Sequence, residues 1–150
     1  MAGSATVVQG GRAKAYRPLP PSQRRVAFEA GLAAYARGDF FQAHELLEPA
    51  WMGSPDLAER ELVQGLIKLA AAYVHDVRGN PAGVAKNLRG ARARLVAAVA
   101  AVAGPDTTAT ESDAPRPAEI DVTSLVAAID ARLEAPDVPS EPPAIKRMSR

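Results

Sequence analysis

Apolar residues recur at helical spacing through most of the chain. Two stripes show the pattern most clearly: Phe28, Leu32 and Tyr35, and then Leu62, Leu66, Leu69 and Tyr73. Intervals of three and four residues place each stripe on one face of a helix. No segment shows a convincing alternation with the period of two that marks a half-buried strand. The pattern therefore predicts an all-α protein.

Glycine, proline and capping residues divide this pattern into four or five helices. The predicted helices run from about Pro21-Ser22, with Ser22 as candidate N-cap, to 37; from Phe40 to about Ala50; from Ser54 or Pro55 to about Arg78; from Pro81 to about Ala103; and from Asp121 to about Leu133. The residues expected to cap the second and fourth helices are Asp39 and Asn80, because their side chains can accept hydrogen bonds from the first free amides, and Asp121 is expected to open the fifth helix.

A weak internal repeat suggests how the helices are arranged. Arg37-Gly38-Asp39 and Arg78-Gly79-Asn80 stand 41 residues apart, and each separates two predicted helices. The repeat predicts a small bundle of antiparallel, tetratricopeptide-like helical hairpins. Chance similarity between two Ala-rich hairpins is the alternative, and the hairpins are expected in either case. The predicted core consists of Leu32, Leu47, Leu66, Leu69, Tyr73, Leu88 and Leu95.

Proline marks the ends of the helical domain. Ten of the 13 prolines fall within residues 18–21, 105–117 and 136–143. We therefore expect a flexible N-terminal tail (1–19), a helical domain (20–103), a linker (104–119), an additional C-terminal helix (120–135) and a flexible Pro-rich tail (136–150).

Composition narrows the class of protein. The 18 basic and 17 acidic residues give a net charge of +1, which gives no electrostatic indication of a nucleic-acid partner. The chain has no cysteine, so it has neither disulfides nor a thiolate metal site. No stretch reaches 18 uncharged apolar residues, so no membrane span is expected. We expect a cytoplasmic protein.

The segment from Phe40 to Trp51 carries the candidate chemistry. His44 and Glu48 are four residues apart, so on a continuous helix they share a face, and Trp51 follows three residues later. An imidazole and a carboxylate at this spacing can bind a divalent metal ion or form an acid/base pair. The alternative is a structural tether, with Trp51 as a core anchor. The zinc-peptidase motif H-E-x-x-H is excluded, because Glu48 occupies the place of its second histidine.

The third predicted helix offers partners for this segment. Gln64, Lys68 and His75 lie close to a single stripe, and Lys68 is expected to be solvated. Gly65 predicts close packing against the helix that begins at Phe40. We therefore expect His44 and Glu48 to face Gln64, with Trp51 closing one side of a polar pocket. Pro49 either ends its helix early or leaves the carbonyl of Glu45 free as an acceptor.

Three segments together resemble a known family. They are Arg37 to Glu45 with Trp51, Leu62 to Ala70, and His75 with Arg78-Gly79-Asn80, and the chain resembles the family called domain of unknown function 309 over about residues 24–95. The family's hallmark is His-x-x-x-Glu-x-x-Trp, matched here by His44, Glu48 and Trp51. The resemblance implies a small all-α protein of bacteria or archaea with a motif suggested to bind metal. Lys68 stands where a neutral polar residue is common, and its charge would disfavour a bound cation.

Two functions remain open from the sequence. The first is a pocket protein that binds a divalent metal or small ligand, for example a metal-dependent hydrolase. In that case His44 and Glu48 would be the metal ligands, and Gln64 or His75 would complete the site. A catalytic zinc takes three protein ligands, so this hypothesis needs a third. The second is a non-catalytic interaction module that presents its hairpins to a partner peptide or to a second copy of the chain. Convergence of the four polar residues in one concave site would favour the first.

Overall fold

Helices account for most of the chain, as the spacing of apolar residues predicts. A computed structural model describes residues 5–9, 12–16, 18–102 and 113–148, so most of the predicted linker lies outside the described residues. The helical elements are α1 (Pro21–Ala36), α2 (Phe40–Leu47), the 3-10 turn η1 (Glu48–Trp51), α3 (Leu57–Val77), α4 (Pro81–Val102), the 3-10 turn η2 (Pro117–Glu119) and α5 (Val122–Glu134). Within the described residues, no helix is both long and apolar enough to cross a membrane.

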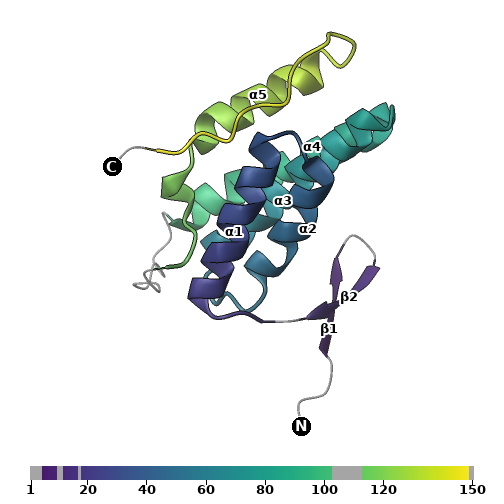
Figure 1. Cartoon of the computed structure of the whole chain (residues 1–150). Coiled ribbons are helices and arrows are strands. Elements are labelled where there is room, and N and C mark those ends of the chain that lie inside the picture. The colour runs from purple at the N-terminus through teal and green to yellow at the C-terminus, as the bar shows by residue number, and fades with distance from the viewer. Residues whose placement is uncertain (1–4, 10–11, 17, 103–112, 149–150) are drawn as a thin grey trace.

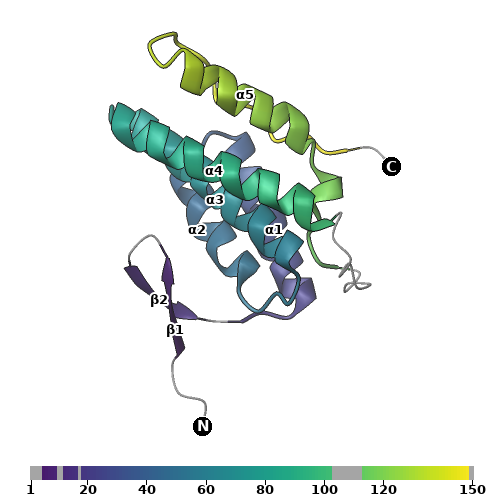
Figure 2. The ribbon, with the colours of Figure 1, turned by 180° about the vertical axis from the view of Figure 1, so that it is seen from behind.

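The helices form two hairpins, α1–α2 and α3–α4, and α3 lies between α2 and α4. Short turns join α1 to α2 and α3 to α4, and a glycine with positive φ stands in each: Gly38 at 82° and Gly79 at 70°. Figures 1 and 2 show α1 and α2 on one side of α3 and α4 on the other. The predicted all-α hairpin architecture is confirmed, and α5 packs against α4.

Two short strands near the N-terminus were not predicted by the sequence pattern. The strands β1 (Ala5–Gln9) and β2 (Arg12–Tyr16) form an antiparallel hairpin, with Ala5 opposite Tyr16. In both Figure 1 and Figure 2 this hairpin lies on the opposite side of the helices from α5.

Side-chain caps fix three helix starts: two at the predicted cap residues Asp39 and Asn80, and one at Asp121, where the fifth helix was predicted to open. The carboxylate or amide oxygens of Asp39, Asn80 and Asp121 accept hydrogen bonds from the backbone amides of Gln42, Gly83 and Ser124 at 3.2, 3.2 and 3.0 Å. Each cap satisfies an amide that has no partner within its helix.

One predicted cap and one predicted helix start are wrong. No side chain caps α1, whose N-cap residue is Pro20 rather than Ser22. The helix α3 begins at Leu57, later than predicted, and Asp56 caps it by accepting a hydrogen bond from the amide of Ala58 at 3.1 Å. Ser54 is buried and does not cap α3. Its hydroxyl donates a hydrogen bond to the carboxylate of Glu59 inside that helix.

The end of α2 follows from Pro49. Proline has no amide hydrogen, so it cannot donate the α-helical hydrogen bond to the carbonyl of Glu45. The α-helix ends at Leu47, and the chain continues as the 3-10 turn η1. Of the two alternatives for Pro49, an early end to the helix is the one observed.

The predicted core is confirmed with one exception. Leu47, Leu66, Leu69, Leu88 and Leu95 are fully buried and Tyr73 is 1% exposed, whereas Leu32 is only partly buried at the edge of the cluster. The three pairs that the internal repeat relates are buried as well: Ala43 and Val84, Leu47 and Leu88, and Ala50 and Ala91. The repeat therefore marks equivalent core positions in the two hairpins.

Glycine sets the distance between neighbouring helices, but with different partners from those predicted. A Cβ atom at Gly65 would lie 2.9 Å from Cγ of Leu95, so Gly65 allows the approach of α4 and not of α2. The close approach of α1 and α2 occurs at Gly31, where a Cβ atom would lie 2.5 Å from Cγ of Leu47.

A buried ion pair joins the first and third helices. Nε of Arg24 donates to Oε2 of Glu59 at 2.8 Å, and the two side chains are 2% and 0% exposed. Arg24 also donates to the carbonyl of Leu19 at 2.7 Å, and the hydroxyl of Ser54 donates to the same Glu59 carboxylate. These bonds hold the chain before α1 and the loop before α3 against the core.

The segment after α5 returns along the helices. The amide of Met148 donates to the carbonyl of Glu119 at 2.8 Å, and the hydroxyl of Tyr35 donates to the carbonyl of Pro143 at 2.7 Å. Figure 1 shows this segment running back beside α5. The sequence pattern gave no sign of these contacts.

Glu59→Ala should lower the free energy of unfolding by about 3–5 kcal/mol, because it leaves the Arg24 guanidinium buried without its carboxylate. Urea unfolding followed by circular dichroism measures the change. Asp130→Ala removes an exposed ion pair with Arg92 and is the matched control, for which a far smaller change is expected. Equal losses in the two variants would contradict a structural role for the buried pair.

Candidate ligand-binding groove

A groove of about 650 Å³ crosses α2, α3 and the start of α4. Its lining residues are Phe41, His44, Ile67, Lys68, Ala71, Val74, His75, Arg78, Asn80, Ala82, Gly83, Lys86 and Asn87. The helix α3 supplies the floor, α2 one wall and α4 the other. The volume falls in the range that small-molecule sites occupy in proteins.

The groove carries positive charge. Lys68, Arg78 and Lys86 line it, and no acidic side chain does so among the residues that the structure describes. None of these three cations forms an ion pair with another described residue. We call this feature the cationic groove.

The positive charge of the groove affects the pKa of Lys68. Burial, and the positive charges of Arg94 and Lys86, lower the pKa of the Lys68 ammonium from its ordinary value of 10.5. Arg94 is itself paired with Glu61 at 3.0 Å, whereas Lys86 has no such partner among the described residues. An anion beside Lys68 would offset both the desolvation and the repulsion.

Two glycines of α4 receive the side chains of Lys68 and His75. A Cβ atom at Gly90 would lie 2.8 Å from Cδ of Lys68, and one at Gly83 would lie 2.5 Å from Cγ of His75. The two glycines are seven residues apart in α4, and Lys68 and His75 are seven residues apart in α3, which is about two helical turns in each case. Because α3 and α4 run antiparallel, Gly90 faces Lys68 while Gly83 faces His75, and both side chains lie flat against α4.

The two imidazoles have different surroundings. Nδ2 of Asn80 donates to Nδ1 of His75 at 3.1 Å, so the residue that caps α4 also orients this ring. His44 is 26% exposed, and its Nδ1 lies 3.4 Å from Oε1 of Glu45 on the same helix. His44 thus reaches the groove from the α2 wall, and His75 reaches it from the α3 floor.

The structure brings together part of the residue set that the sequence singles out. His44 and His75 line the groove with Lys68, whereas Gln64, Glu48 and Trp51 do not. Glu48 and Trp51 both belong to η1, which begins where α2 ends, and the carboxylate oxygens of Glu48 and the indole nitrogen of Trp51 are buried. Among the described residues, no three His, Cys, Asp or Glu side chains are grouped closely enough to hold a metal ion.

The contribution of α4 was missed by the sequence analysis. Lys86 and Asn87 lie in a helix that carried no candidate residue. One signal could have found this wall, namely two glycines in α4 at the same spacing of seven as Lys68 and His75 in α3. In an antiparallel hairpin, equal spacing allows each glycine of α4 to lie opposite one of the two polar side chains of α3.

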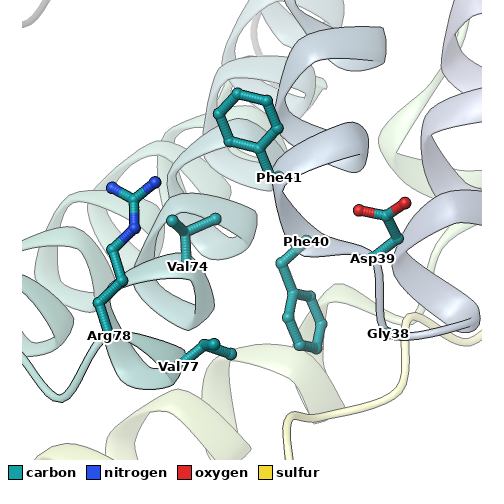
Figure 3. A pocket seen from close by; sticks show the side chains of 7 residues that line it. All are labelled: Gly38, Asp39, Phe40, Phe41, Val74, Val77 and Arg78. Carbon is teal, nitrogen blue, oxygen red and sulfur yellow. The ribbon is translucent and has the colours of Figure 1, made fainter.

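A smaller hollow of about 280 Å³ adjoins the cationic groove (Figure 3). It is lined by Gly38, Asp39, Phe40, Phe41, Val74, Val77 and Arg78, and shares Phe41, Val74 and Arg78 with the groove. We call it the apolar notch. Phe40 is held in place by aromatic packing, with its ring centroid 5.2 Å from that of Tyr35 and 5.6 Å from that of Tyr73.

Comparison with known protein families gives one match. Residues 28–87 match the model of the family described as domain of unknown function (DUF309). The resemblance is confirmed. Every residue that lines the cationic groove or the apolar notch lies within this DUF309 match. No curated protein and no solved structure matches the chain.

Gly83→Ala should displace the His75 ring, because the added Cβ atom would overlap Cγ and Nδ1 of the ring. The ring signals of His75 in a ¹H–¹³C NMR spectrum should shift, and those of His44, the only other histidine, should change much less. Unchanged His75 signals would show that Gly83 does not determine the position of this ring.

Proposed function

We propose that the cationic groove binds a small molecule through a phosphate group. One observation carries the proposal: Lys68 and Lys86 line the same groove, close enough for the charge of Lys86 to lower the pKa of Lys68, and no acidic residue lines it among those described. Arg78 adds a third cation farther along the same groove. Clustered cations repel one another, and a dianion offsets that repulsion while accepting charge-assisted hydrogen bonds.

The placement of Lys68 supports binding rather than simple solvation. A lysine on a protein surface ordinarily extends into water, which stabilises its charge. Lys68 instead lies against Gly90, where burial lowers the pKa of its ammonium group. Holding a charge in this place costs free energy, and a bound anion would reduce that cost.

The sequence hypothesis of a divalent metal at His44 and Glu48, as in a metal-dependent hydrolase, receives less support. Glu48 does not line the groove that His44 enters, and three cationic side chains there oppose a bound cation. The hypothesis of an interaction module differs in its occupant, which would be a peptide or second protein. The groove's volume suits a small molecule better.

Inorganic phosphate should bind the groove and shift the NMR signals of both histidine rings. Lys68→Ala and Lys86→Ala should each weaken phosphate binding about tenfold, because each removes one positive charge from the groove. Lys146→Ala makes the same change in charge on the exposed C-terminal segment and is the matched control. Loss of affinity in all three variants alike, or no shift at either histidine, would overturn the proposal.

The affinity should also depend on pH in a defined direction. Only the protonated form of Lys68 attracts the anion, and its pKa lies below the ordinary 10.5. Above about pH 8 most of the inorganic phosphate is already the dianion, so further change reports mainly on the protein. Affinity should therefore fall as the pH rises from 8 to 10, and calorimetric titration should show a smaller fall for Lys68→Ala.

A further inference from the structure

The two hollows form one continuous surface with a change of chemistry along it. Phe41, Val74 and Arg78 border both, so no helix separates the cationic groove from the apolar notch. Between Lys68 and the notch, the floor of α3 is apolar, formed by Ile67, Ala71 and Val74. A molecule bound beside Lys68 therefore meets apolar side chains on the groove floor as it extends toward the notch.

The notch differs from the groove in its charge. It has one cation, Arg78, and one anion, Asp39, so the two charges balance. Phe41 is 55% exposed and Val77 is 78% exposed, although both are large apolar side chains. Figure 3 shows Val74 between Arg78 and Phe41, with Phe40 and Val77 below them. Such a surface suits an uncharged, apolar group.

We propose that the ligand is an amphipathic phosphate monoester. Its phosphate lies between Lys68 and Lys86, and its apolar group extends over Ala71 and Val74 to Phe41. This inference rests on the proposed function and names the class of ligand for the same groove. Six residues of α3 separate Lys68 from Val74, or about 9 Å along the helix axis, so the apolar group must be an extended one.

The test compares two probes that carry the same charged group, methyl phosphate and hexyl phosphate. Calorimetric titration of the full chain should give at least tenfold tighter binding of hexyl phosphate, because each buried methylene contributes to affinity. Phe41→Ala should reduce this advantage, measured as the ratio of the two affinities, at least threefold. Val26→Ala removes an apolar side chain that is 68% exposed on α1, away from the groove, and should change neither value.

The outcomes separate this inference from the proposed function. Equal binding of the two probes, with both weakened by Lys68→Ala, would overturn the amphipathic ligand and leave a phosphate site. A hexyl advantage that survives Phe41→Ala would also overturn it, since the chain would then lie elsewhere. Absence of binding by either probe would overturn both proposals. Because Phe41 is largely exposed, its replacement is expected to leave the fold intact.

Discussion

The close approach of α3 and α4 is the constraint on which both the core and the groove depend. At Gly65 the two backbones come near enough that a Cβ atom would meet Leu95, and the same packing places Gly83 and Gly90 against His75 and Lys68. A methyl group at any of these positions would push a partner side chain aside. The hairpin can therefore bury its leucines. It also holds Lys68 and His75, which are about two helical turns apart, along its outer edge.

This packing gives α3 two roles at once. One face, with Leu62, Leu66 and Leu69, fills the core between the hairpins, and its start is tied to α1 by the buried pair of Arg24 and Glu59. The neighbouring stripe carries the groove floor. Since the core face is fully enclosed, α3 cannot rotate to release Lys68 into water without exposing leucines. The positive charge is thus kept at the groove by hydrophobic packing some distance away.

The sequence was informative where local physics decides the outcome. Periodicity placed the helices, and short polar side chains predicted the caps at Asp39 and Asn80, because both depend on residues within one turn. Six of the seven predicted core residues are nearly fully buried for the same reason. The start of α3 was misplaced because Ser54 forms a hydrogen bond with Glu59, a tertiary contact that competes with capping.

The candidate site was predicted only in part, because it depends on helix pairing. Periodicity brought His44, Glu48 and Trp51 onto one face, but Pro49 ends α2 before Glu48, and only His44 reaches the groove. Lys68 was expected in solvent, since nothing within α3 indicates that Gly90 lies opposite. Lys86 had no local signal at all. Its significance follows from its position across the hairpin from Lys68.

A double-mutant cycle on Gly90 and Lys68 tests the central claim most directly. Gly90→Ala adds a Cβ atom 2.8 Å from Cδ of Lys68, a flexible side chain that can move away, and alanine favours the helix by about 1 kcal/mol. The variant should therefore keep its stability and bind inorganic phosphate about tenfold more weakly. In the Lys68→Ala background, the same glycine change should have no further effect on phosphate affinity. Independent, additive losses would contradict the claim that α4 positions Lys68 for an anion.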